Sequence, residues 1–102
     1  MSEKYFGWAG RILHVDLSRE DISVCSLSPD LTRKFIGQSG INAALLSSLA
    51  GPQMDPLSPQ APLLFGVGPL GGTMAPCSGR FTLTFKSPLT GIFADSNCGG
   101  HF

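Results

Sequence analysis

Apolar and polar residues alternate near the start of the chain. From residue 11 to residue 17, every second position is apolar, at Leu13, Val15 and Leu17. This two-residue period predicts a β-strand. Residues 18–21 are polar and break the pattern, and residues 22–27 resume it. The two extended segments are therefore predicted to pair as a hairpin.

Two helices are predicted next. Ser28 can cap free backbone N–H groups and Pro29 has no N–H to leave unpaired, so this pair marks the start of a first helix. Gly37 is predicted to end it. The second helix is predicted over residues 41–49, before a Gly-Pro pair stops it. Its apolar face is expected to consist of Ile41, Ala44, Leu45 and Leu49.

Three strands are predicted in the rest of the chain. Residues 62–67 are a short apolar run between turn residues, residues 80–86 alternate phenylalanine or leucine with threonine, and residues 92–94 are a last short apolar segment. The resulting order β-β-α-α-β-β-β predicts a β-rich α+β domain with an N-terminal hairpin. Residues 95–102 are small, polar or glycine, and a loop is predicted there.

The composition predicts one small folded domain. The chain has 102 residues, of which 42% are hydrophobic and 14% are charged, a balance that does not favour disorder. Seven basic and seven acidic side chains cancel, so we expect no nucleic-acid partner.

A cytosolic (cytoplasmic) protein is predicted from the distribution of charges and of helix breakers. The first eight residues carry charges and lack the apolar stretch of a secretory signal. Prolines and glycines interrupt the long uncharged part of the chain, so we expect no membrane span and no membrane partner.

The three cysteines favour free thiols. Cys25, Cys77 and Cys98 are an odd number and contain no CxxC pair, which argues against a disulfide framework and against a self-contained zinc or iron–sulfur site. Buried free thiols are the prediction.

The middle of the chain carries very little charge. Between Lys34 and Arg80 the sole charged side chain is Asp55. Turn-rich segments normally lie on the surface and collect charge, so this surface is expected to face a ligand or another protein. Residues 66–71 satisfy GxGxxG, but the residues after them are poor helix formers, which disfavours a dinucleotide-binding turn.

Arg80 follows this uncharged stretch and begins a predicted strand. It can be a strand-end arginine in water, which the residues alone favour, or a fork of hydrogen-bond donors for an anionic or heteroaromatic ligand. The glycines of residues 95–102 would let a bulky ligand approach the backbone closely.

Several short motifs occur in order along the chain: WAGRIL at 8–13, FIG at 35–37, DPLSP at 55–59, GPL at 68–70, AP at 75–76 with GR at 79–80, and KSPLTG at 86–91. Together they resemble the opening of tungsten- or molybdenum-containing aldehyde:ferredoxin oxidoreductases. The likeness covers nearly the whole chain, and the order and spacing of the motifs make it specific.

The resemblance implies that residues 1–102 are about the first of two repeats in a duplicated N-terminal domain, which cradles a tungsten (or molybdenum) bis-pyranopterin. It implies that Arg80 bridges the pterin and a [4Fe-4S] cluster, and that the backbone carbonyl of Asn97 helps to hold the magnesium that joins the pterin phosphates. The adjoining Cys98, Gly99 and Gly100 are the other expected cofactor contacts. The family's cluster cysteines and its later pterin-binding segments have no counterpart here, so none of the three cysteines is assigned to the cluster.

The resemblance therefore implies part of an enzyme that oxidises aldehydes to carboxylic acids and passes electrons through the cluster to ferredoxin. Alone, the chain is expected to be inactive. The alternative is a non-catalytic interaction module that self-associates or pairs with a separately encoded partner. In either case the expected partners are the remaining domains of the oxidoreductase or a second copy, and the charge-poor stretch predicts a dimer.

Overall fold

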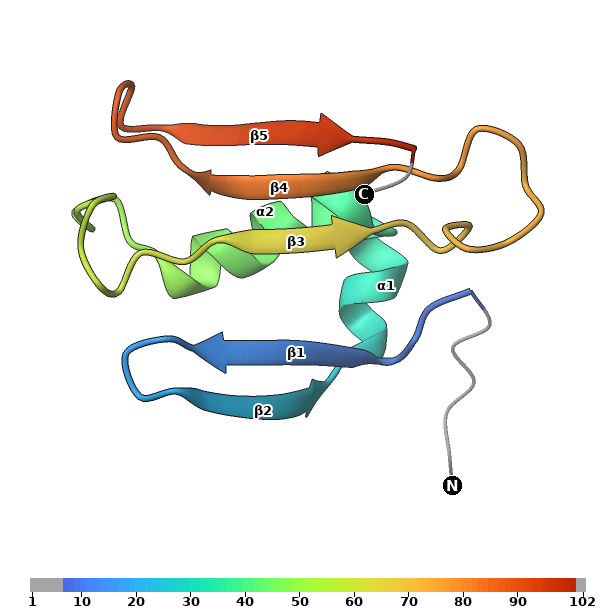
Figure 1. Cartoon of the computed structure of the whole chain (residues 1–102), viewed down its shortest axis with the longest axis horizontal. Helices are drawn as coiled ribbons and strands as arrows, with labels where there is room; N and C mark the ends of the chain where they lie inside the picture. Colours follow the sequence, from blue (N-terminus) through green and yellow to red (C-terminus); the bar gives the residue numbers. More distant parts are fainter. Residues whose placement is uncertain (1–6, 101–102) are drawn as a thin grey trace.

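The computed structural model describes residues 7–100, with two helices and five strands in the predicted order, so the α+β fold is confirmed (Figure 1). One sheet is the hairpin, and the other is antiparallel with β4 in its centre. The elements are β1 (Arg11–Asp16), β2 (Asp21–Ser26), α1 (Pro29–Phe35), α2 (Gln38–Leu49), β3 (Leu64–Val67), β4 (Phe81–Lys86) and β5 (Phe93–Cys98).

The hairpin is held by its ladder and by an aspartate at its turn. Asp16 Oδ1 accepts hydrogen bonds from the N–H groups of Ser18 at 3.1 Å and Arg19 at 3.3 Å, which forms a tight turn without glycine. One side of the hairpin is apolar, because β1 and β2 pair Leu13 with Val24 and Val15 with Ile22. These four side chains are 46–65% exposed.

Helix α1 begins as the sequence predicts. Ser28 is its N-cap, and the Ser28 hydroxyl accepts a hydrogen bond from the Asp30 N–H at 3.3 Å. Helix α2 begins at Gln38, earlier than predicted, and has 12 residues. Within residues 7–100, neither helix has the length and hydropathy to cross a membrane.

The predicted apolar face of α2 is wrong at its C-terminal end. Leu49 is 58% exposed, whereas Asn42 and Leu46 are 3% and 7% exposed. The reason is that α2 packs on β4 through a polar side chain. Asn42 Nδ2 donates to the backbone oxygen of Thr82 at 3.2 Å and to Thr84 Oγ1 at 3.1 Å. Both amide hydrogens are paired, which offsets the cost of burying them.

Strand β4 turns its threonines toward α2, which lies behind the sheet in Figure 1. Thr82 and Thr84 are 2% and 0% exposed. In β3, Gly66 leaves room for the Asn42 amide, since a Cβ there would lie 2.8 Å from Asn42 Cγ. The opposite side of the sheet, here called the open sheet face, carries Phe65, Val67, Phe81, Leu83 and Phe85.

The chain exposes more surface than a compact domain of its size. Its solvent-accessible area is 7836 Å², about 40% more than the size scaling gives for a compact monomer of this mass. Its Cα radius of gyration is 14.4 Å, against about 13 Å for a compact domain of similar length. Two apolar surfaces contribute: the apolar side of the hairpin and the open sheet face.

We predict that Gly66→Ala lowers the free energy of unfolding by about 1–3 kcal/mol, because the new methyl group displaces the buried Asn42 amide. Urea denaturation followed by circular dichroism measures this. Gly51→Ala is the control, since a Cβ at Gly51 meets nothing within 4 Å. Equal effects of the two substitutions would contradict the role given to Gly66.

Candidate functional site

A cleft of about 390 Å³ lies at one end of the second sheet. Here β3 ends, β4 begins and β5 ends, and Figure 1 shows the three strand ends on the same side of the molecule. The junction between α1 and α2 and the glycine- and proline-rich loop of residues 68–71 complete the walls. Ile36, Gln38, Cys77, Arg80 and Asn97 also line it.

Strained backbone is concentrated at this cleft. Ile36 has φ 66° and ψ −66°, and the Gly37 N–H donates to the Phe35 oxygen at 2.7 Å, which is the rare, positive-φ form of the γ-turn. Gln38 and Cys77 also have positive φ, at 46° and 60°. Of the four described non-glycine residues with positive φ, these three line the cleft. Strain of this kind gathers at functional sites, so it supports the choice of this cleft.

The α1–α2 junction is tied to three other parts of the chain. Trp8 Nε1 donates to the Ile36 oxygen at 2.6 Å, and Gln38 Nε2 donates to the Arg80 oxygen at 2.8 Å. Gly37 packs against the loop after β3, where a Cβ would lie 3.1 Å from Gly68 Cα. The cleft therefore has a fixed wall rather than a free loop.

Arg80 is the one charged residue among those that line the cleft. Its backbone is held by Gln38, and its side chain lies along Gly99, where a Cβ would be 3.2 Å from Arg80 Cγ. Within residues 7–100, Arg19 forms an ion pair with Asp16 at 4.0 Å. Arg80 forms no ion pair with a carboxylate in that range. The guanidinium thus offers its donors to an anion or to a polar ring.

Asn97 lies in a strand, not in the predicted loop. The prediction ended the last strand at Ala94, but β5 continues to Cys98 because its backbone pairs with β4 up to that residue. Asn97 is opposite Thr82 in this ladder, and Thr82 Oγ1 donates to Asn97 Oδ1 at 2.7 Å. The structure brings Asn97 and Arg80 to the same cleft.

Cys98, Gly99 and Gly100, which follow Asn97, have different surroundings. Cys98 is opposite Phe81 in the ladder and so belongs to the open sheet face rather than to the side that carries Asn97. Gly99 lies against the Arg80 side chain. Gly100 has φ 77° and open space around it, so the backbone there is accessible.

The cysteines are free, but the prediction that they are buried is wrong. Cys25 and Cys77 are exposed and Cys98 is partly exposed. Cys25 lies in β2, all of whose residues are exposed, and Cys77 is on the loop between β3 and β4. In the described part of the chain, no three of the His, Cys, Asp and Glu side chains could hold a metal ion together.

Sequence reasoning missed Gln38 and the strained turn beside it. FIG at residues 35–37 was part of the family motif, but no local pattern indicates that Ile36 takes a positive φ. A glutamine directly after the glycine that was predicted to end the first helix is the one available signal, since its long amide can reach a neighbouring backbone oxygen.

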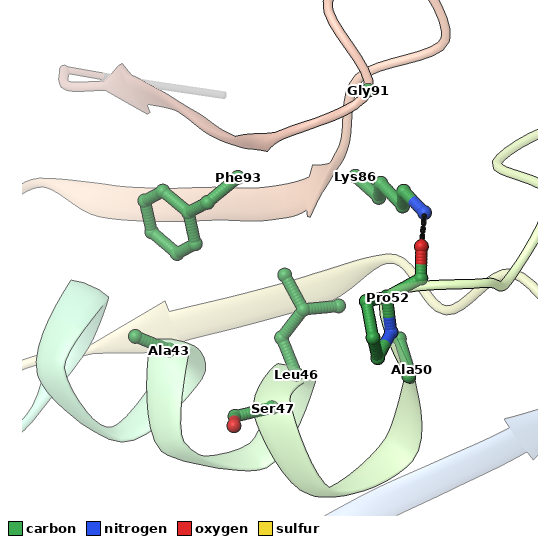
Figure 2. Close-up of a pocket in the computed structure, with 9 residues that line it drawn as sticks. Ala43, Leu46, Ser47, Ala50, Pro52, Lys86, Gly91 and Phe93 are labelled. Atoms are coloured by element: carbon green, nitrogen blue, oxygen red, sulfur yellow. Dashed lines mark hydrogen bonds between the residues drawn. The ribbon is translucent and has the colours of Figure 1, made fainter.

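A second hollow, of about 220 Å³, lies between α2 and the opposite end of β4 (Figure 2). Leu46 and Phe93 point into it from the helix and from β5. Its one charged group is already engaged, because Lys86 Nζ donates to the backbone oxygens of Pro52 at 3.0 Å and Met54 at 2.7 Å. Lys86 therefore fastens the chain after α2 to the sheet, and this hollow is the weaker candidate for a ligand site.

Comparison with known proteins finds relatives of this chain both by sequence and by structure. Residues 12–102 match the family described as aldehyde ferredoxin oxidoreductase, N-terminal domain. The tungsten-containing aldehyde ferredoxin oxidoreductase of Pyrococcus furiosus is 43% identical over 98 residues, which are 96% of this chain and 16% of that protein. The corresponding protein of Pyrococcus horikoshii is 41% identical over 97 residues, 95% of this chain and 16% of that protein.

A solved structure shares the fold. It is the active site complex BamBC of benzoyl coenzyme A reductase in complex with 1,5-dienoyl-CoA, with a TM-score of 0.85 and 32% sequence identity. The match covers 90% of this chain and 14% of that chain. The present chain thus spans a small part of the length of the proteins it resembles.

We predict that Ile36→Gly raises the free energy of unfolding by about 1 kcal/mol, because glycine removes the strain of the positive φ. Ile92→Gly is the matched control: Ile92 is 66% exposed, against 64% for Ile36, and is not among the described residues with positive φ. That control should lower the free energy of unfolding by about 0.5–1 kcal/mol, the ordinary cost of glycine. Urea denaturation of both variants measures the difference, and losses of equal size would show that Ile36 is unstrained.

Proposed function

Because this chain belongs to the aldehyde ferredoxin oxidoreductase family, whose N-terminal domain it matches, we propose that it forms one wall of a metal-pterin site in such an enzyme. The observation that carries the proposal is the cleft that Arg80, just before β4, and Asn97, near the end of β5, both line. The cofactor would be a tungsten (or molybdenum) bis-pyranopterin, with magnesium on its phosphates. When bound, it supplies the oxidation of an aldehyde to a carboxylic acid.

The residues of the cleft fit such a group. The cleft offers a single charge, which is positive, and the cofactor's phosphates are anionic. Gly72 and Gly79 are next in the chain to residues that line the cleft, and a Cβ at either would meet nothing within 4 Å, so a bulky ligand can approach the chain closely there. Side chains for a metal centre are lacking within residues 7–100, so the metal's ligands would come from the pterin and from other parts of the enzyme.

Each candidate residue has a definite task in this proposal. Arg80 would donate hydrogen bonds to the pterin and would lie between it and a [4Fe-4S] cluster held elsewhere in the enzyme. The Asn97 backbone carbonyl is a hard oxygen ligand of the kind that magnesium prefers. Gly99 and Gly100 allow the cofactor to approach, whereas Cys98, on the other side of β5, would contribute backbone groups only.

The substrate is expected to depend on other parts of the enzyme. The relatives named above act on different compounds by their names, an aldehyde in one case and benzoyl coenzyme A in the other, yet both match nearly the whole of this chain. We therefore assign to this chain the contact with the cofactor. Transfer of electrons to ferredoxin, through the cluster, would likewise depend on the remainder of the enzyme.

The exposed apolar surfaces support an extensive contact with a partner. In the whole enzyme this partner would be the remaining domains, which make up most of the length of the relatives. If the chain acts alone as an interaction module, the partner would be a second copy, related by a two-fold axis that uses one patch twice. A cytoplasmic location is part of this proposal, since exposed free thiols suit a reducing compartment.

We predict that Arg80→Ala, in the oxidoreductase that contains this chain, lowers the tungsten or molybdenum content per protein about tenfold, the loss expected for a charge-assisted hydrogen bond. Elemental analysis of the purified enzyme measures it. In the 102-residue chain the same substitution should change the free energy of unfolding by less than about 0.5 kcal/mol. Arg19→Ala, in the hairpin turn, is the control; metal content unchanged in Arg80→Ala, or a large loss of stability, would refute the role of Arg80.

We also predict that the isolated chain is a dimer at micromolar concentration and that Phe65→Lys makes it monomeric, because a charge on the open sheet face cannot be buried. Sedimentation velocity distinguishes the 10.7 kDa monomer from the dimer. Leu57→Lys is the control, since Leu57 is 79% exposed and lies outside the open sheet face. A wild-type chain that sediments as a monomer would contradict this.

A further inference from the structure

We propose that Thr82 is a positioning residue for the cleft: its buried hydroxyl holds the side-chain amide of Asn97 by the oxygen, so that the amide nitrogen is left to donate to an oxyanion beside Arg80. The inference rests on the proposed function in that it takes this cleft as the ligand site. It adds two residues, Thr82 and Asn42, to which that function assigns nothing.

The Thr82 hydroxyl is buried and donates its hydrogen bond to the side chain of Asn97. Thr82 is 2% exposed, so water does not compete for its hydroxyl, and Oγ1 donates to Asn97 Oδ1 at 2.7 Å. Asn97 itself is exposed and would otherwise turn freely between rotamers. A buried donor that bonds an exposed amide therefore selects one orientation of that amide.

The orientation in which Thr82 holds the Asn97 amide leaves its N–H donors available to an anion. An amide has one accepting oxygen and one nitrogen with two donors. With the oxygen taken by Thr82, the nitrogen points away from Thr82, and the described residues supply no acceptor to it. Asn97 and Arg80 both line the cleft, so the amide N–H groups and the guanidinium can bind the same oxyanion.

Asn42 fixes the position of Thr82 in turn. Its amide donates to the backbone oxygen of Thr82 and to the hydroxyl of Thr84, and it is 3% exposed. The result is a continuous chain of hydrogen bonds from helix α2 through β4 to the edge strand β5. Thr84 shares the contact with Asn42, but in the described part of the chain the side-chain hydrogen bond to Asn97 comes from Thr82, which makes Thr84 a suitable comparison.

The test compares Thr82→Val, which keeps the shape and removes the hydroxyl, with Thr82→Ser, which keeps the hydroxyl, and with Thr84→Val. In the 102-residue chain, NMR couplings and relaxation report the Asn97 side-chain rotamer. We expect one rigid rotamer in the wild type, in Thr82→Ser and in Thr84→Val, and averaged rotamers in Thr82→Val. Should Thr82→Val fail to fold, the wild-type measurement still decides, because an averaged Asn97 side chain overturns the proposal.

Titration with inorganic pyrophosphate, observed at the Asn97 and Arg80 side-chain signals, tests the use of that orientation. We expect Thr82→Val to weaken binding about fivefold, the effect of one neutral hydrogen bond, with rescue by Thr82→Ser and no change in Thr84→Val. Equal weakening in Thr82→Val and Thr84→Val would mean a merely structural role and overturn the proposal. If the wild type binds no pyrophosphate while its Asn97 rotamer is rigid, the ligand site of the proposed function is refuted and the hydrogen-bonded arrangement of Asn97 stands.

Discussion

The amide of Asn42 is the contact on which the arrangement of helix and sheet depends. It is buried between α2 and the central strand β4, where its two hydrogens bond the backbone of Thr82 and the hydroxyl of Thr84. These bonds need a specific register, because a shift of β4 by one residue would place phenylalanine or leucine under the amide and leave its donors unpaired. They also need glycine at position 66 in β3, because a Cβ there would collide with the Asn42 amide.

This contact also determines the geometry of the cleft. Gln38, Asn42 and Leu46 are spaced four residues apart and so lie along one side of α2. Asn42 bonds the middle of β4, and Gln38, one turn earlier, bonds the backbone of Arg80 just before β4 begins. To present Gln38 in this way, the chain passes through the strained turn at Ile36. The bonds to β4 thus hold together both the helix and the wall of the cleft.

Local patterns were sufficient for the elements but not for the sides that they bury. The hairpin, the capped start at Ser28 and the strand at residues 81–86 follow from alternation and capping, which act over a few residues. The buried side of α2 could not be predicted, since it includes Asn42, a polar residue whose partners are 40 and 42 positions away. For the same reason β4 buries its threonines, while its apolar side is only partly buried.

Like the fold, the candidate site could be predicted from the sequence in part. Arg80, Asn97 and Gly99 were found by resemblance, and the structure brings them together. Gln38, Thr82 and the γ-turn at Ile36 contribute through contacts between distant segments, which leave no local signal.

The positive charge of Arg80 is the single charge of the cleft, and its effect depends on the polarity of its surroundings. Two unit charges at 4 Å attract by about 1 kcal/mol in water and about 4 kcal/mol at the effective dielectric constant of about 20 near a protein surface. Arg80 follows a long stretch with Asp55 as its sole charge, so a partner that covers this region excludes water without burying further charges. The same cation would then hold an anion more tightly in the assembled enzyme than in the isolated chain.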